Sequence, residues 1–494
     1  MRVVQQKQMV LGEINIADIK FNPKSRDDID QILKGLQYLY CQTETREKLF
    51  AILERMTAPG IDKNNGRPGM ELWKIFVLAM LRLNLNWDYD RLLHMANHNL
   101  LIRQMLGHSD IFDNYKYELQ TIKDNFKLLT PEILEEINTF VVNSGHELVK
   151  KGNAEGRIVL KCRADSFVVK TNVHFPTDIS LLYDAMRKTI ELIGKLFVDN
   201  NMLGWRQYKH NVRILKKEMH KVQRSKKSKA KTAEINIKEA HETYIELSKK
   251  FLDRVKSDIN LLEGKKLLSE SNLIKTTIID KYIKHAERQI SQIGRRVLKG
   301  ETIPHNEKLF SIFQPHTEWI SKGKAGVPVE FGIRVGIVED QYQFLLHHRV
   351  MQKETDEKTT VTMVQESKKK FPGMHAVSYD RGYYSRNNLE ELEKELEHVS
   401  LPKKGKLSNK DRDIQNSDSY RYAKQKHSAV ESAINALDIH GLDKCLDHGI
   451  CGFQRYVAIA VVSRNIQRIG AIIHKRDQKL HEKRERRKRL KAVG

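Results

Sequence analysis

Three acidic residues hold positions from which a folded chain can do chemistry. Asp380 ends a short apolar run in VSYDRGYYS (377–385), and Gly382 follows it closely. The run is typical of a brief buried strand, so we expect Asp380 at the carboxyl edge of a sheet, where α/β proteins tend to carry their chemistry. An aspartate that only caps its own turn gives the same local pattern. The motif therefore needs support from the rest of the chain.

Asp165 and Glu431 supply that support. Asp165 lies inside strand-forming sequence, RADSFVV, where an unpaired charge is costly, although a structural salt bridge would also explain it. Glu431 lies on an expected helix, HSAVESAINAL, and shares one face with His427 and Asn435, as an ordinary surface glutamate also would. Together with Asp380 they can converge above one sheet edge and form an all-oxygen site.

An all-oxygen site of this kind suits Mg²⁺ or Mn²⁺ rather than zinc. Two such ions per site can activate a water or a 3′-hydroxyl for an in-line phosphoryl displacement and stabilise the leaving oxygen. The chain carries 87 Lys and Arg against 63 Asp and Glu, a formal charge of +24. That surplus attracts polyanions, and double-stranded DNA is the natural partner, although an anionic membrane or a ribosome would also fit.

Several classes of function find little support in the sequence. We find no apolar run near the ~20 residues that cross a bilayer and no secretory segment, so we expect no membrane partner. Four cysteines in 494 residues suit a reducing cytoplasm. Because no P-loop or dinucleotide fingerprint is present, we expect no nucleotide cofactor. Four zinc-type ligands lie close together without a CxxC pair: His440, Cys445, His448 and Cys451. Either a structural metal or ordinary packing would explain them.

The elements that must position the carboxylates alternate along the chain. Helical patterns with capped joints fill residues 1–150, as in a helix-turn-helix domain or any small helical bundle. Strand-forming sequence covers 158–175, and apolar stripes in the long helical stretch that follows predict an antiparallel helical hairpin. Strands resume at 327–338 and 342–350, and a further strand ends at Asp380. Without the helical detour, these elements make an α/β sheet with a possible three-stranded meander.

Four motifs in this order resemble the DDE transposases of bacterial insertion sequences, the IS-four/IS-five-like group. They are ADSFVVKTNVHFPTDISLLYDA (164–185), PHTEWISKGK (315–324), YDRGYYS (379–385) and HSAVESAINALDIHGLDKCLDHGICGF (427–453). GRPGMELWKIFVLAMLRLNL (66–85) is also similar to the helical N-terminal domain of that group.

The resemblance implies an α/β ribonuclease H-like catalytic domain, with a mixed five-stranded sheet and flanking helices. A long helical insertion would interrupt this domain, and an all-helical DNA-binding domain would precede it. The expected limits are 1–150 for the helical N-terminal domain, 151–470 for the catalytic domain, 178–304 for the helical-hairpin insertion and 471–494 for a basic C-terminal tail.

By the same resemblance, Asp165, Asp380 and Glu431 are the catalytic, metal-binding triad. The implied activity is a transposase that binds terminal inverted repeats and uses Mg²⁺ or Mn²⁺, two ions per site, for cleavage and strand transfer. Pairing two DNA ends makes a homodimer the expected state. The alternatives are a nuclease or resolvase of the same fold that does not join ends, and a DNA-binding protein without catalysis.

Basic side chains near these motifs and at the end of the chain are candidate DNA contacts. Relatives often carry a Y-x2-R-x3-E-x6-K pattern around the glutamate, and this chain departs from it at Lys424, His427 and Asp438. Lys424 keeps a positive charge, whereas Asp438 replaces a lysine with an acid. The expected DNA contacts are Arg381, Lys322, Lys324, Lys424, His427, Lys226, Lys227, Arg486 and Arg487.

Overall fold

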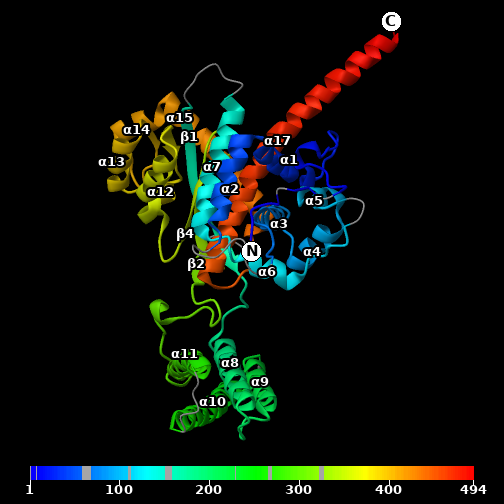
Figure 1. The fold of residues 1–494 in the computed structure, drawn as a ribbon. Coiled ribbons are helices and arrows are strands. Elements are labelled where there is room, and N and C mark those ends of the chain that lie inside the picture. Colours follow the sequence, from blue (N-terminus) through cyan, green and yellow to red (C-terminus); the bar gives the residue numbers. More distant parts are fainter. Residues whose placement is uncertain are drawn as a thin grey trace. The chain divides into compact units, whose positions relative to one another are not determined.

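A computed structural model describes most of the chain (Figure 1). The described residues are 2–6, 8–9, 11–57, 68–109, 113–150, 158–227, 230–264, 270–321 and 328–493. They divide into two compact units: residues 1–172 with 320–494, and residues 173–319. Each unit has its own hydrophobic core. The domain limits expected from the sequence stay predictions.

Among the described residues, seven α-helices precede the first strand, and they pack into the same core as the sheet. They are α1 (Asp28–Cys41), α2 (Thr43–Glu54), α3 (Leu72–Asn84), α4 (Tyr89–His98), α5 (Leu100–Met105), α6 (Leu119–Phe126) and α7 (Pro131–Lys150). Two of the expected capped joints are present: Asp88 accepts from the Arg91 N–H at 2.7 Å, and Asn99 accepts from the Ile102 N–H at 3.1 Å. Both oxygens satisfy amides that the first helical turn leaves without partners.

The sheet is mixed and has seven strands among the described residues. They are β1 (Leu160–Thr171), β2 (Glu318–Ser321), β3 (Val329–Glu339), β4 (Leu345–Met351), β5 (Met374–Ser378), β6 (His398–Ser400) and β7 (Lys444–Cys445). The order is β2-β3-β1-β5-β6, with β4 also paired to β3 and β7 to β1. The expected meander is present as antiparallel β1, β3 and β4, and β5 and β6 add to it in parallel.

The strand count differs from the five that we expected. The additional strands are β2 and β7, of four and two residues. Such short segments are too short to show a strand periodicity in the sequence. They are strands because they pair with β3 and β1 in the folded sheet. The mixed α/β class itself is confirmed.

Helices cover both faces of the sheet. The helices that follow β4 are α12 (Asp356–Lys370), α13 (Arg386–Glu395), α14 (Asn409–Asn416), α15 (Asp418–His427), α16 (Ala429–Leu437) and α17 (Gly449–Val493). Figure 1 shows α12 and α13 on one side of the sheet, and α7 and α17 on the other. Ser385 caps α13 as expected, accepting from the Asn388 N–H at 3.1 Å.

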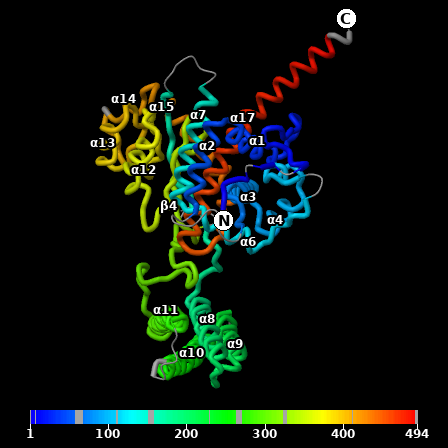
Figure 2. The backbone as a smooth tube through the Cα atoms, viewed as in Figure 1, coloured from blue at the N-terminus to red at the C-terminus, as the bar shows by residue number. Residues whose placement is uncertain are grey.

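The long helix α17 is a core element for most of its apolar length. It packs along α1 (Figure 2) and also contacts α3, α7 and β4. Among the described residues it alone is long and apolar enough to cross a membrane, but 72% of its most apolar window is buried in the protein. Burial of that kind is typical of a core helix, in keeping with a soluble protein.

The second unit is helical. It contains α8 (Asp178–Asp199), α9 (Tyr208–Ser225), α10 (Ala233–Gly264) and α11 (Glu270–Ile293). The apolar stripes expected to pack do so, since Tyr244, Val255 and Ile290 lie in one core. Residues of α8 and α9 belong to the same core. α11 packs against α8, and α10 packs against α9, in addition to the contact between α10 and α11.

Candidate active site

The parallel pairing of β1 and β5 brings two predicted site residues to matching positions. Arg163 is the register partner of Ser378. Asp165 lies two residues further along β1, and Asp380 lies two residues further along the chain, just past the end of β5. Neighbouring strands are about 4.8 Å apart. The two aspartates therefore meet at one edge of the sheet, as the position of Asp380 after a short strand suggested.

Glu431 joins them from a helix. It lies in the first turn of α16, which packs against β1. Burial, together with the negative charges of Asp380, Asp356 and Glu431, raises the pKa of Asp165 to about 6. The hydrogen bond that the Ser166 N–H donates to Asp165 Oδ1, at 2.7 Å, acts in the opposite direction. The structure thus brings Asp380 and Glu431 within electrostatic reach of Asp165.

Asp380 also has the local role that its sequence motif allowed. Its Oδ1 accepts from the Arg381 N–H at 2.6 Å and begins the short 3-10 helix Arg381–Tyr383. The Asp380 side chain is exposed, so its second oxygen is accessible. Tyr383 is buried and packs against Tyr379 with ring centroids 4.7 Å apart, which makes Tyr383 a packing residue.

A fourth carboxylate, Asp356, was not expected. It begins α12, its Oδ1 accepts from the Ser166 hydroxyl at 2.6 Å, and its Oδ2 lies 3.8 Å from Arg334. Two protein partners already hold this carboxylate, whereas in the described part of the chain Asp165 accepts only from the main-chain N–H of its neighbour. The sequence signal for Asp356 was an acidic residue in the first helical turn, a position that also serves any helix dipole.

His427 lies close to Asp380, Glu431 and Arg163. His427 ends α15 and pairs through Nδ1 with the Ser378 hydroxyl at 3.2 Å. Burial lowers the pKa of His427, while the charges of Asp380 and Glu431 raise it. Arg163 donates to Glu339 Oε2 at 2.5 Å, so its charge is matched within the sheet. His427, expected as a DNA contact, therefore has a position that supports the site.

The donors at this site fit a divalent cation by their chemistry. Carboxylate oxygens are the ligands that Mg²⁺ prefers. Burial and the negative charges of the neighbouring carboxylates raise the pKa of Asp165, and a bound cation would offset that repulsion. In the part of the chain that the structure describes, no three His, Cys, Asp or Glu side chains are grouped as a metal-ion cluster.

Exposed cations lie on segments that follow β5 or pack against it. Arg381 and Lys424, both expected DNA contacts, are exposed. The structure adds Lys404, which the sequence reasoning missed: its Nζ donates to the Gly382 carbonyl at 3.0 Å and so lies on the Asp380 loop. Its neighbour Lys403 is 2.6 Å from Asp411. The KKGK run at 403–406 was the available signal.

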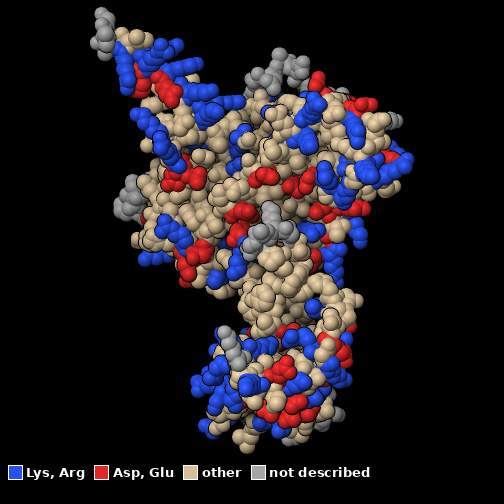
Figure 3. Space-filling model, turned by 180° about the vertical axis from the view of Figure 1, so that it is seen from behind, with Lys and Arg blue, Asp and Glu red and all other residues tan. Residues whose placement is uncertain are grey.

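The other expected DNA contacts lie elsewhere. Arg486 and Arg487 are exposed near the end of α17, where Figure 3 shows Lys and Arg side chains gathered. Lys226 and Lys227 follow α9 in the helical unit. Lys322 and Lys324 lie outside the described residues.

The cysteine and histidine cluster near residue 445 has protein partners. His440 is buried and pairs through Nδ1 with the main-chain carbonyl of Asn84. Cys445 is buried and its thiol donates to the Asp447 carbonyl at 3.7 Å. Cys451 is exposed. These contacts explain His440 and Cys445 as packing residues.

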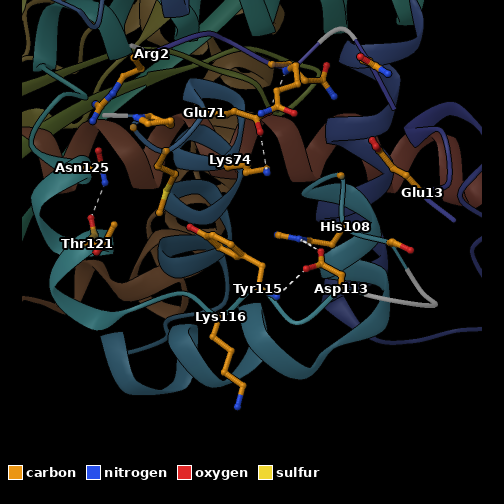
Figure 4. A pocket seen from close by; sticks show the side chains of 18 of the residues that line it. Arg2, Glu13, Glu71, Lys74, His108, Asp113, Tyr115, Lys116, Thr121 and Asn125 are labelled. Carbon is orange, nitrogen blue, oxygen red and sulfur yellow. Dashed lines mark hydrogen bonds and ion pairs between the residues drawn. The ribbon is translucent and has the colours of Figure 1, made fainter. Parts of the chain in front are cut away.

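A cavity of about 850 Å³ lies among the N-terminal helices (Figure 4). His108, Asp113 and Tyr115 point toward one another there, and Lys74 pairs with Glu71 at 2.8 Å. None of the predicted site residues lines this cavity. Two of its acidic residues pair with basic residues of the same lining, Glu71 with Lys74 and Asp113 with His108, and the carboxylate edge of the sheet remains the candidate active site.

The chain was also compared with known proteins. No family model, curated protein or solved structure matches it. Its function is therefore argued from its own residues.

Proposed function

We propose that the chain is a DDE transposase that binds the terminal inverted repeats of a bacterial insertion sequence, cleaves DNA there and joins the freed ends to a target. The observation that carries the proposal is that Asp380 and Glu431, far from Asp165 in the sequence, lie close enough for their charges to add to the burial that raises its pKa. A strand interior, a strand end and a helix each contribute one carboxylate.

The finer fold is part of the proposal. An antiparallel meander extended by parallel strands, with helices on both faces, supports a ribonuclease H-like catalytic domain. The helical unit of residues 173–319 interrupts that sheet between β1 and β3, as an insertion would. The N-terminal helices would then serve DNA binding.

Asp165, Asp380 and Glu431 are the residues that would hold two Mg²⁺ or Mn²⁺ ions. Such ions, when bound, activate a water or 3′-hydroxyl and stabilise the leaving oxygen of a phosphodiester. The chain's own part is to hold the three carboxylates at one edge. Ser166 orients Asp165, and the Arg381 N–H orients Asp380.

Charge and location complete the proposal. A formal charge of +24 favours binding to DNA, and the exposed residues Arg381, Lys404 and Lys424 would contact its backbone. The substrate would be double-stranded DNA at both the element ends and the target. We infer a homodimer on paired ends and a cytoplasmic, nucleoid-associated location.

The test uses a supercoiled plasmid that carries the DNA flanking this gene. Wild-type protein with Mg²⁺ or Mn²⁺ should cut at the repeat boundary and leave a 3′-hydroxyl, and both chelator and Asp380→Asn should abolish cutting. Asp413→Asn is the matched control, because Asp413 is exposed on α14 and carries no role in the site. Tight binding without cutting by wild-type protein would favour the DNA-binding alternative.

A further inference from the structure

The helical unit contains a small cationic pocket of about 280 Å³. Residues from four separate segments line it: Lys226 after α9, Arg296 after α11, Lys308 beyond it and Trp319 in β2. All of its lining residues belong to the same unit, 173–319. The volume is near the lower end for ligand sites, so it suits one group of a larger partner rather than a whole drug-sized molecule.

The charge of the pocket is not balanced by its own lining. Three cations face one carboxylate, Asp178, which is already paired with Arg296 at 2.7 Å. Within the described residues, neither Lys226 nor Lys308 forms an ion pair. Although the Lys226 side chain remains accessible, partial burial and the charge of Arg296 lower its pKa, and Asp178 raises it. The pocket therefore favours an anion.

Aromatic rings lie beside these cations. Phe310 and Trp319 both line the pocket, with ring centroids 5.8 Å apart. Trp319 is 40% exposed, whereas Trp73 and Trp205 are fully buried. Exposed aromatic faces next to cations bind single-stranded nucleic acids, because bases stack on the rings while phosphates meet the positive charges.

We propose that this pocket binds a phosphate group of a single-stranded nucleic-acid segment, with a neighbouring base against Trp319 and Phe310. The inference assigns a nucleic-acid site outside the carboxylate edge. It rests on the proposed function only for the choice of nucleic acid over another polyanion. Lys226, already expected to contact DNA, gains defined neighbours in this pocket.

The test is a fluorescence titration of the full chain with a short single-stranded oligodeoxynucleotide, in the presence of chelator. Binding should change the Trp319 signal, and Trp319→Phe should remove that change. Lys226→Gln combined with Lys308→Gln should weaken binding at least about tenfold and make the salt dependence less steep by about one phosphate contact. The matched control, Lys209→Gln with Lys299→Gln, removes two exposed lysines outside the pocket and should change little.

Three results would overturn this site: equal affinity in the wild type and the pocket variant, an equal loss in the control, or a fluorescence change that persists in Trp319→Phe. The same titration is also run with inorganic phosphate and with a blunt DNA duplex. If either bound at the pocket as tightly as the single strand, the assignment to single strands would be wrong. Because chelator prevents cleavage, failure here is separate from failure of the plasmid assay.

Discussion

At the scale of single residues, the carboxylates at the sheet edge differ in what already holds them. Asp356 accepts from Ser166 and lies near Arg334, whereas Asp380 is exposed and, among the described residues, accepts only from the Arg381 N–H. A carboxylate whose oxygens have few protein partners can bind a cation, while a carboxylate whose oxygens are already paired orients its neighbours. This difference separates the proposed ligands from a supporting residue.

Asp356→Asn should therefore reduce cleavage by about 10- to 100-fold at most, the usual cost of an outer partner, because an amide oxygen still accepts from Ser166. Asp380→Asn should cost more than that. Plasmid cleavage rates at saturating Mg²⁺ compare the two variants. An Asp356→Asn variant as inactive as Asp380→Asn would make Asp356 a member of the catalytic group.

At the scale of elements, the contact between α1 and α17 depends on glycine. A Cβ added at Gly470 would lie 1.8 Å from the Gln31 carbonyl oxygen, and one added at Gly35 would lie 2.1 Å from the Ile466 carbonyl oxygen. Two main chains in such close approach leave no room for a side chain. The pair fixes how α17 lies against the N-terminal helices.

Gly470→Ala should destabilise the protein by about 1–3 kcal/mol, since overpacking forces the two helices apart. Gly452→Ala in the same helix is the control, because the nearest atom to its added Cβ is 3.5 Å away. Alanine there should be neutral or slightly stabilising. Thermal unfolding compares both with the wild type, and equal melting temperatures for the two variants would contradict the close contact.

The sequence predicted the helices and strands better than it predicted the contacts between residues far apart in the chain. Strand and cap signals near Asp88, Asn99 and Ser385 are local, so they could be read directly. Asp356 and Lys404 could not be placed, because their relation to the site arises from contacts with Ser166 and Gly382 far along the chain. The short strands β2 and β7 were missed for the same reason.

At the scale of the whole molecule, the positive charge is concentrated in part at the end of the chain. Residues 482–494 contain seven Lys and Arg against two Glu. The described part of this stretch continues α17, and most of its side chains are exposed. A helix of this composition binds phosphates without reading sequence.

Deleting residues 482–494 should weaken binding to random duplex DNA and flatten its dependence on salt. The fold should persist, since the deletion keeps the Lys34–Asp477 ion pair at 2.8 Å and the Arg476 contact with Leu148. Filter binding over a range of salt concentrations measures the slope, and an unchanged slope would show that the tail makes no phosphate contacts. Thermal unfolding is the control for folding.

The most direct test of the central claim is a strand-transfer assay. Pre-cut duplex ends with a free 3′-hydroxyl are incubated with a supercoiled target plasmid, wild-type protein and Mg²⁺ or Mn²⁺. Covalent joining of the 3′-hydroxyl to the target, lost with chelator and in Asp380→Asn, is the predicted result. Metal-dependent cutting of the flanked plasmid without any joining of these ends would contradict a transposase and leave a nuclease of the same fold.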